Sequence, residues 1–256
     1  MAIFLPRLWW HKPRARAEGA ARVGIDCRKI LDYGIGTITA NLIENLAAID
    51  SETSYFLFGD PDVVGVKGPN FTTIKETTKR YSIRESIRLP GHSQKLDLDL
   101  LHWLHYATSP IKRCKYVVSI HDINHLLLPE LLSSRVHRKY AEQMLRLSAR
   151  VADRIITASN SSKKEIIEHL HVPEEKVAVI HNGVSEAFKE LPSDEVTASL
   201  RSDFGLESPY ILYVGSLREH KNVRRLLEAF EIARKRLGNN LSLVIAGEHR
   251  GQKAAL

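Results

Sequence analysis

The stretch VGIDCRKILDYGIGTITANLIENL, residues 23–46, decides the fold, because a buried strand runs through a glycine-containing loop straight into a helix. The strand is the apolar run Arg22–Asp26, and the loop carries Gly34 and Gly36. Apolar residues then recur at steps of three and four, the spacing of one helical face. The residues of this face are Ile35, Ile38, Leu42, Leu46 and Ile49. Strand, loop and helix in this order predict the first half of a βαβ unit.

The same alternation continues along the chain. The further apolar runs that we expect to be strands are Ser54–Phe58, Phe71–Ile74, Leu98–His102, Tyr116–Ile120, Arg154–Ala158, Val177–Ile180, Tyr210–Val214 and Ser242–Ala246. Most are apolar at nearly every position, which is typical of parallel strands covered on both faces. The repeated order of strand, helix and strand predicts an α/β fold with a doubly wound, Rossmann-like parallel sheet.

Three more helices are expected between these strands. The apolar face of the first consists of Val136, Tyr140, Met144, Leu147 and Val151. The second contains Ile166, Ile167 and Leu170 and begins at Ser161 or Ser162, either of which can cap it. The third begins after Asn222 and ends before Gly238. Its expected buried residues are Val223, Leu226, Leu227, Phe230 and Leu237.

Two domains are expected after a short leader. Residues 1–21 form the leader, residues 22–191 an N-terminal domain, and residues 192–256 a linker helix with the start of a second Rossmann-like domain. One strand, one helix and one strand follow Pro209, and a lone βαβ unit cannot cover both faces of its own sheet. We therefore expect the second domain to be truncated.

The charge balance is basic, with 37 Lys and Arg residues against 30 Asp and Glu residues and a formal charge of +7. This balance favours anionic partners such as nucleotide phosphates, acidic lipids or nucleic acid. Nucleic acid is set aside, because the chain has no basic strand pattern rich in aromatic residues and no known binding motif. Cys27 and Cys114 lie far apart and lack metal-ligand spacing, so we expect buried or half-buried thiols in a reducing compartment, with neither a disulfide framework nor structural zinc.

The leader allows two interpretations. It is apolar first and basic from His11 to Arg16, which is the reverse of a signal peptide. It is either disordered or a peripheral membrane contact, in which Phe4, Leu5, Trp9 and Trp10 enter the interface beside the cations. No apolar run of the sequence reaches the ~18 residues of a membrane-spanning helix. We expect a cytoplasmic protein, with a peripheral place at the inner face of the membrane as the second interpretation.

Ligands on open α/β sheets bind beyond the carboxyl ends of the strands, so the loops there are the candidate sites. Gly34 and Gly36 follow the first strand, where glycines let backbone N–H groups approach an anion at a helix start. A tight turn without a ligand explains the same residues equally well.

His121 and Asp122 follow the run Tyr116–Ile120. An imidazole at this position can exchange hydrogen bonds with a substrate hydroxyl near neutral pH. The alternative is a solvent-facing loop, or a histidine bonded to the backbone. His102, at the end of the run Leu98–His102, is a second candidate.

The loop Gly215–Asn222 follows the strand Tyr210–Val214 and also contains Ser216. A glycine turn, the cations Arg218 and Lys221 and an Asn cap can hold an anion at a helix start. The alternative is a solvated basic loop.

Four segments in this order resemble glycosyltransferase family 4. They are the opening stretch, VVSIHDI at residues 117–123, ASNSSKKEIIEHLHVPEEKVAVIHNGV at residues 158–184, and YILYVGSLREHKNVRRLLEAF followed by LSLVIAG within residues 210–247. The resemblance covers Val23 to about Gly247. It implies the GT-B fold, in which two Rossmann-like domains face each other across the active site.

The resemblance also implies roles for single residues. The catalytic residue would be His121, beside the transferred sugar. The donor-binding residues would be Gly34, Gly36, Gly215, Ser216, Arg218 and Lys221. The acceptor-binding residues would be Asp122 and His102. The implied chemistry is retaining transfer of a hexose, such as mannose or glucose, from a nucleotide-diphosphate sugar to a glycan or lipid-linked acceptor, without a metal or other cofactor.

The sequence departs from the family pattern in three ways. Tyr33 stands where the family often has the first of two glycines, and Ser216 stands where many members have an Arg. Arg218 or His220 would then supply that phosphate contact. The paired-glutamate helix that holds the ribose and the sugar would lie beyond residue 256. We therefore expect a truncated enzyme, with a catalytically inactive acceptor- or partner-binding module as the alternative.

Overall fold

The computed structural model describes residues 19–65, 67–78, 84–128, 132, 134–206, 209–217, 221–237 and 241–247. The chain forms two compact units, Met1–Gly183 (unit 1) and Val184–Leu256 (unit 2). The division precedes the boundary expected at Leu191 and falls in the stretch between the last strand of unit 1 and the first long helix of unit 2. Residues 1–18 of the expected leader lie outside the described residues.

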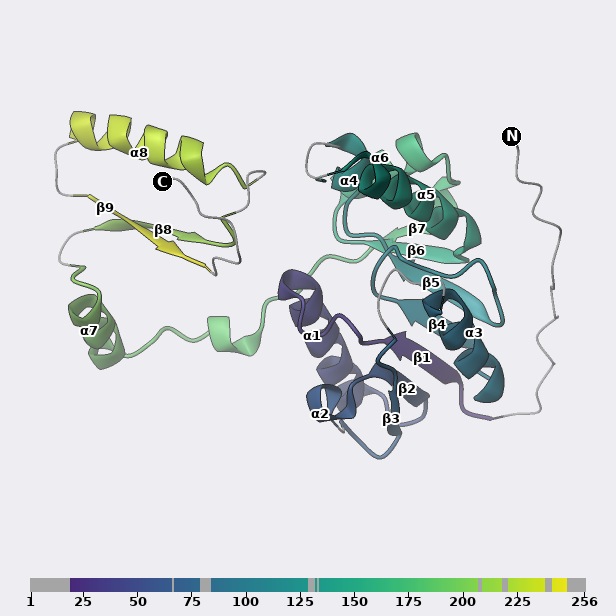
Figure 1. The fold of residues 1–256 in the computed structure, drawn as a ribbon. Coiled ribbons are helices and arrows are strands. Elements are labelled where there is room, and N and C mark those ends of the chain that lie inside the picture. Colours follow the sequence, from purple (N-terminus) through teal and green to yellow (C-terminus); the bar gives the residue numbers. More distant parts are fainter. Residues whose placement is uncertain are drawn as a thin grey trace. The chain divides into compact units, whose positions relative to one another are not determined.

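Unit 1 is built on a seven-stranded sheet (Figure 1). Its strands are β1 (Arg22–Asp26), β2 (Ser54–Gly59), β3 (Phe71–Lys75), β4 (Leu100–Trp103), β5 (Lys115–Ser119), β6 (Arg154–Thr157) and β7 (Val177–Val179). Their order is β3-β2-β1-β4-β5-β6-β7, and every neighbouring pair is parallel. The expected Rossmann-like parallel sheet is therefore confirmed. Strand β4 begins later than expected, because the Leu98 N–H donates to the carbonyl of Ser93 in the preceding helix instead of to a strand.

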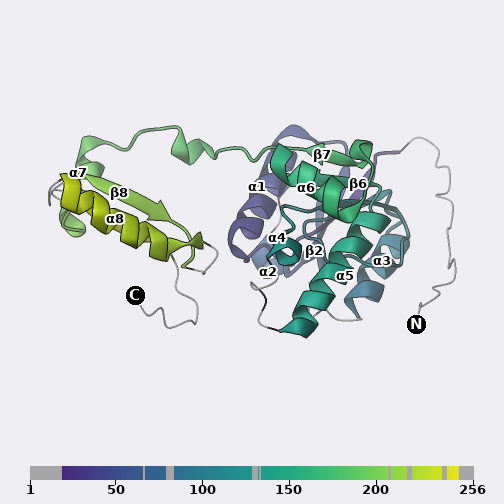
Figure 2. The same cartoon turned by 90° about the horizontal axis from the view of Figure 1, so that it is seen from above.

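Helices cover both faces of this sheet (Figures 1 and 2). Helices α1 (Tyr33–Ile49) and α2 (Pro61–Val64) pack on one face, where Ile25, Ile43 and Leu57 form part of the buried cluster. The helices on the other face are α3 (Glu85–Lys95), α5 (Arg135–Val151) and α6 (Asn160–Leu170). The core beneath them includes Leu89, Trp103, Tyr116, Leu145 and Ile166. Burial on both faces explains why the strands are apolar throughout.

The faces of α1 and α5 differ from the expectation. In α1, the fully buried residues include Thr39 and Ile43, whereas Ile49 is 79% exposed. The Thr39 hydroxyl donates to the Ile35 carbonyl at 2.7 Å, so a polar residue is accommodated against the sheet.

In α5, small residues bring the helix close to the sheet, and the buried positions are Ala141, Leu145, Ser148 and Ala149. Val136 is 76% exposed and Tyr140 38%, so the predicted apolar face is wrong at these two positions, whereas Val151 packs against the core as expected. The hydroxyl of Ser148 is paired with the hydroxyl of Thr108 at 2.9 Å and donates to the Tyr106 carbonyl. These bonds fix the chain after β4 to α5.

Two local predictions in unit 1 have clear outcomes. Helix α6 is capped by Ser159, whose Oγ accepts from the Ser162 N–H at 3.1 Å, so the expected cap at Ser161 or Ser162 lies too late. The burial of Cys27 and Cys114 as free thiols is confirmed. Burial raises the pKa of Cys27 well above its ordinary value and that of Cys114 to about 12, so both stay protonated near neutral pH.

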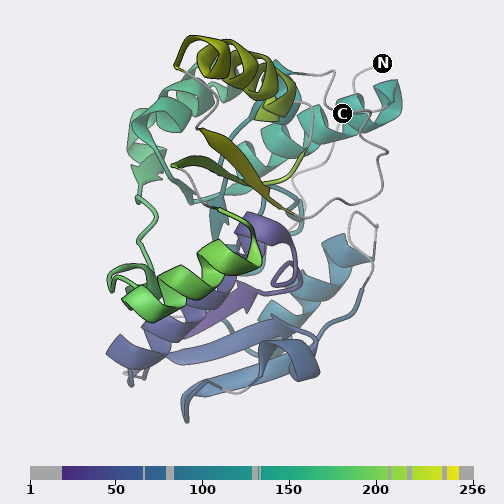
Figure 3. The same ribbon diagram turned by 90° about the vertical axis from the view of Figure 1, so that its left-hand side faces the viewer.

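Unit 2 contains two parallel strands, β8 (Tyr210–Val214) and β9 (Ser242–Ala246), and helices α7 (Asp194–Asp203) and α8 (Val223–Leu237). Ser193 caps α7, and Gly205 follows it with φ of 61°. Helix α8 lies along one side of the strand pair (Figure 3). Its first residue, Val223, is buried, but Leu237 is 76% exposed, so the expected buried face ends before the last turn.

Candidate functional site

The strand order of unit 1 reverses between β1 and β4. From β1, the chain proceeds outward through β2 to β3 and then returns to β4 on the other side of β1. In open α/β sheets, ligands bind outside the carboxyl ends of the strands at such a reversal. The candidate site therefore consists of the segments that follow β1, β4 and β5, which we call the carboxyl edge.

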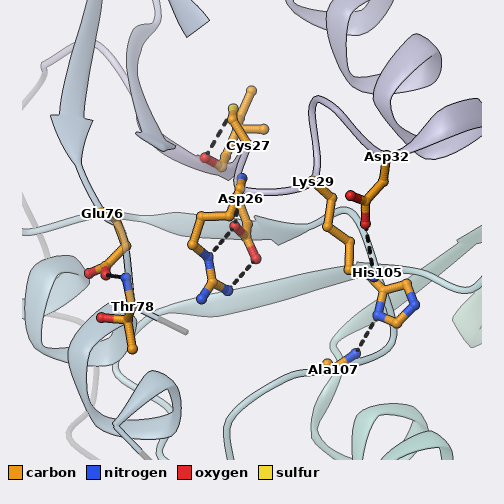
Figure 4. A network of polar contacts seen from close by, with 10 residues as sticks. Asp26, Cys27, Lys29, Asp32, Glu76, Thr78, His105 and Ala107 are labelled. Carbon is orange, nitrogen blue, oxygen red and sulfur yellow. Dashed lines mark hydrogen bonds and ion pairs between the residues drawn. The ribbon is translucent and has the colours of Figure 1, made fainter. Parts of the chain in front are cut away.

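The segment after β1 contains an ion pair that is almost fully buried (Figure 4). Nε and Nη2 of Arg28 donate to Oδ1 and Oδ2 of Asp26, each at 2.7 Å. The side chains of Arg28 and Asp26 are only 5% and 11% exposed. Farther along, Lys29 lies 3.7 Å from the carboxylate of Asp32. Each cation of this segment thus faces a carboxylate of the same segment.

Helix α1 begins directly after this segment, and its two glycines are in different environments. A Cβ on Gly36 would lie 2.2 Å from the Ile30 carbonyl oxygen, so the close approach of the two backbones requires glycine there. A Cβ on Gly34 would meet nothing within 4 Å. Packing therefore explains Gly36 completely, whereas Gly34 at the helix start has room for a neighbouring group.

His121 lies just beyond β5. Its Nε2 is buried and has no hydrogen-bond partner among the described residues. Burial lowers the pKa of His121, while a hydrogen bond to the backbone of Leu104 and the charge of Asp122 oppose this shift. The other ring nitrogen donates to the backbone of Leu104, so Nε2 of the neutral ring is a hydrogen-bond acceptor. A buried acceptor without a partner is costly in the absence of a ligand and is suited to a hydroxyl donor.

His102 lies on β4, next to this group. Its Nε2 is 3.0 Å from Oγ of Ser119 on β5. The pKa of His102 is lowered to about 4, mainly by burial and also by the neighbouring His121, while Asp26 opposes the shift. The structure thus brings His102, His121 and Asp26 into one electrostatic group. Since Nε2 of His102 already has a partner within the protein, its role in acceptor binding remains a prediction.

Three contacts hold the chain around His121 in place. Oδ1 of Asp122 accepts from the Asn124 N–H at 3.0 Å at the start of α4 (Asn124–Leu127). The Thr157 hydroxyl donates to the His121 carbonyl at 3.4 Å. The Tyr106 hydroxyl is 2.8 Å from Nδ1 of His125 on α4. The geometry gives Asp122 an orienting role, and its contact with an acceptor remains a prediction.

The remaining expected site residues belong to unit 2. The Gly215 N–H donates to the Ala246 carbonyl at 2.9 Å, and the Tyr213 hydroxyl donates to the Ser216 carbonyl at 2.9 Å. Gly215 has φ of 157°, and Lys221 is exposed near the start of α8. This turn lies at the carboxyl end of β8. Arg218 and His220 lie outside the described residues.

Sequence reasoning missed several polar residues of unit 1. The buried pair of Asp26 and Arg28, the Ser119 hydroxyl and the bond between Tyr106 and His125 were not predicted. The available signal was position, because each of these residues ends a strand, follows one or lies on the helix after one.

No group of three or more His, Cys, Asp or Glu side chains is placed to hold a metal ion in the described part of the chain. None of the described helices has the length and apolar character needed to cross a bilayer.

A Rossmann-like parallel sheet with a polar carboxyl edge, followed by the parallel β8–α8–β9 unit, is the arrangement expected of the GT-B class of glycosyltransferase folds. A model of Glycosyltransferase Family 4 matches residues 33–188, and a model of Glycosyl transferases group 1 matches residues 198–255. The chain therefore belongs to Glycosyltransferase Family 4.

Two curated relatives show how far this similarity extends. Alpha-D-kanosaminyltransferase of Streptomyces kanamyceticus is 30% identical over 146 residues, which are 56% of this chain and 37% of that protein. O-antigen chain mannosyltransferase B of Escherichia coli is 27% identical over 135 residues, which are 53% of this chain and 35% of that protein. The chain thus spans well under half of the length of these relatives.

Among solved structures, the Anabaena protein HepE in complex with UDP and glucose is similar in fold. The two chains share 16% sequence identity with a TM-score of 0.57, and the match covers 87% of this chain and 60% of HepE. At this level of identity the similarity shows the fold alone. The fold expectation and the family resemblance are confirmed.

Proposed function

We propose that this chain takes part in the transfer of a hexose from a nucleotide-diphosphate sugar, with His121 contacting the transferred sugar. The observation that carries the proposal is the buried Nε2 of His121, which has no partner among the described residues. A sugar hydroxyl can donate to it, and a neutral imidazole makes this bond without the cost of burying a charge.

The carboxyl edge of unit 1 is suited to a neutral ligand. The Arg28 and Lys29 cations face the Asp26 and Asp32 carboxylates, so this segment has no excess charge to attract a diphosphate strongly. Its contribution would be hydrogen bonds to hydroxyl groups, together with the N–H groups at the start of α1 beside Gly34. Unit 1 would then hold the sugar and the acceptor, including contacts from His102 and Asp122.

The diphosphate would bind to unit 2. Gly215, Ser216 and Lys221 lie at the carboxyl end of β8 and the approach to α8, where backbone N–H groups and a cation can meet phosphate oxygens. Arg218 would add a second cation. The positive charge would stabilise the leaving nucleotide, so that no metal or other cofactor is required.

The relatives guide the choice of substrates. One is named as transferring kanosamine with alpha stereochemistry, and another as a mannosyltransferase of the O-antigen chain. We extend these names to a retaining transfer of mannose or glucose to a glycan or lipid-linked acceptor. A cytoplasmic enzyme, with access to nucleotide sugars, fits this chemistry.

Substitution of His121 and Lys221 tests the proposal. His121→Ala is expected to lower turnover of GDP-mannose, UDP-glucose or UDP-N-acetylglucosamine by about 10²-fold, the usual scale for one positioned group. Nucleotide affinity should change little. Lys221→Ala should weaken nucleotide binding as well as slow transfer, because it removes a phosphate contact. His181→Ala is the matched control, since the ring of His181 follows β7 but its Nδ1 already pairs with the Ala158 carbonyl at 3.0 Å.

A binding measurement on the 256-residue chain complements the kinetics. The Cε1–H resonance of His121 should shift when sugar is added and should titrate below pH 6.5, because burial lowers its pKa. Turnover of His121→Ala at the wild-type rate would overturn the catalytic role. Ligand-induced shifts without turnover in any form of the protein would favour the acceptor-binding module instead.

A further inference from the structure

Helix α5 carries a basic outer face. Opposite its buried residues, the exposed cations are Arg135, Lys139, Arg146 and Arg150. The single acidic residue within α4 and α5 is Glu142, and its carboxylate is 3.2 Å from Nε of Arg146. The first two turns of α5 therefore present cations without a carboxylate of their own helix.

Apolar side chains are exposed on α5 and at the end of α4. Val136 and Tyr140, one turn apart on α5, are 76% and 38% exposed. Leu127 and Leu128, at the end of α4, are 36% and 39% exposed. Helices α4 and α5 pack against each other, as Figures 1 and 2 show. Water-facing helix positions are normally polar, so apolar residues grouped on neighbouring helices indicate a surface that contacts a partner.

The spacing along α5 places cationic and apolar side chains in neighbouring rows. Arg135 and Lys139 are four residues apart, and Val136 and Tyr140 form a parallel row one residue farther along. Apolar groups beside cations match the two layers of an anionic bilayer, with acyl chains below and phosphate headgroups above. We propose that the patch of Leu127, Leu128, Arg135, Val136, Lys139 and Tyr140 docks onto the surface of an anionic phospholipid membrane.

Two observations favour a lipid surface over a soluble polyanion. A polyanion would use the cations but would leave Val136, which is more exposed than any other apolar residue of α5, in water. The patch includes the end of α4, and α4 directly follows the His121 segment in the chain. Docking would therefore bring the carboxyl edge of unit 1 towards the bilayer. Presentation of a lipid-linked acceptor there rests on the proposed function, whereas the docking itself does not.

Vesicle co-sedimentation of the full chain tests the docking. We expect binding to vesicles that contain phosphatidylglycerol, little binding to pure phosphatidylcholine, and weaker binding as salt is raised. Val136→Asp and Lys139→Glu should each lower the partition coefficient by about fivefold or more, since one cation at an anionic surface contributes roughly that factor. The matched controls are Ile49→Asp on α1, where Ile49 is 79% exposed, and Lys164→Glu on α6, where Lys164 is exposed.

The outcomes are distinct. All of the substituted side chains are exposed, and circular dichroism checks that each variant keeps its fold. The proposal is overturned if the patch variants bind as well as the wild type, or if the controls lose as much binding. The membrane contact would then lie elsewhere in the chain, for example in residues 1–18. Replacement of Trp9 and Trp10 by Ser should leave the dependence on Val136 intact. Equal binding to both kinds of vesicle, no binding at all, or binding to dextran sulfate without binding to vesicles also overturns it.

Discussion

The Nε2 of His102 lies 3.0 Å from Oγ of Ser119, so a hydrogen bond joins the neighbouring strands β4 and β5 at the edge where His121 is found. The imidazole is buried, and burial lowers its pKa to about 4. His102 is therefore neutral in the folded protein near pH 7. A charge on either His102 or His121 would disfavour a charge on the other.

The low pKa of His102 predicts how stability depends on pH. In the unfolded chain a histidine binds a proton below about pH 6.5, whereas folded His102 does so only near pH 4. The unfolded state thus binds more protons in this window, and stability is lost as the pH falls, by up to about 1.4 kcal/mol per pH unit. His102→Gln should reduce the change in unfolding free energy between pH 7 and pH 5 by about 2 kcal/mol, measured by urea unfolding.

Ser119→Ala separates the hydrogen bond from burial. It removes the partner of His102 but leaves the ring inside, so stability at pH 7 should fall by about 1 kcal/mol. The pH dependence should remain, because burial is the main cause of the low pKa. If Ser119→Ala abolishes the pH dependence and His102→Gln does not, the assignment to His102 is wrong.

Arg28→Met should be strongly destabilising. It leaves the Asp26 carboxylate, which is 11% exposed, without its bidentate partner, and breaking a buried pair in this way costs about 3–5 kcal/mol. Arg146→Ala breaks the exposed pair with Glu142 and should cost under about 1 kcal/mol. Urea unfolding compares the two variants. Replacing both Asp26 and Arg28 with apolar residues should recover part of the loss, and similar costs for Arg28 and Arg146 would contradict the burial argument.

The two glycines at the start of α1 should respond oppositely to alanine. Gly36→Ala places a Cβ 2.2 Å from the Ile30 carbonyl oxygen, so the backbone must shift, at a cost of about 1–3 kcal/mol. Gly34→Ala meets nothing within 4 Å and should stabilise the helix by up to about 0.5–1 kcal/mol. Thermal unfolding measures both. A Gly34→Ala variant that is stable but binds donor or acceptor more weakly would assign this helix start to the ligand.

The end of the β8–β9 pair depends on a second close approach. A Cβ on Gly247 would lie 1.9 Å from the Gly215 carbonyl oxygen, so Gly247→Ala should force the strand ends apart. The bond from the Gly215 N–H to the Ala246 carbonyl should weaken, and amide hydrogen exchange near the end of β8 should accelerate. Gly183→Ala is the control, because its Cβ would meet nothing within 4 Å. Unchanged exchange in Gly247→Ala would contradict this expectation and would show that the strand ends accommodate the added Cβ without weakening this bond.

The sheet could be predicted from the sequence because its strands are buried on both faces and are therefore apolar throughout. The helix faces could not be predicted as well. Spacing alone favoured Ile49 and Val136, yet the sheet contacts Thr39 of α1 and the small residues of α5, such as Ala141. Small side chains carry a weak hydrophobic signal, although they allow the closest packing between a helix and a sheet.

The candidate site was only partly predictable for a related reason. Position after a strand singled out His121, and its unpaired Nε2 fits that interpretation. Nothing in the order of residues could show that Asp26 and Arg28 form a buried pair, because charges two residues apart are common and usually solvated. The hydrogen bond between His102 and Ser119 depends on the register of β4 and β5, and this register is determined only in the folded sheet.

The position of β1 in the sheet also has a consequence for biosynthesis. Its first partner, β2, follows within the same βαβ unit. The hydrogen bond from the Arg22 N–H to the carboxylate of Asp99, just before β4, spans 77 residues. At roughly 5–20 residues per second, the ribosome needs several seconds to make that interval. During this time the emerging chain holds β1 as an unpaired, apolar edge, the kind of segment that chaperones shield. Until β4 has been made, the open edge of the half-sheet β3-β2-β1 is thus a site at which the nascent chain is prone to aggregate.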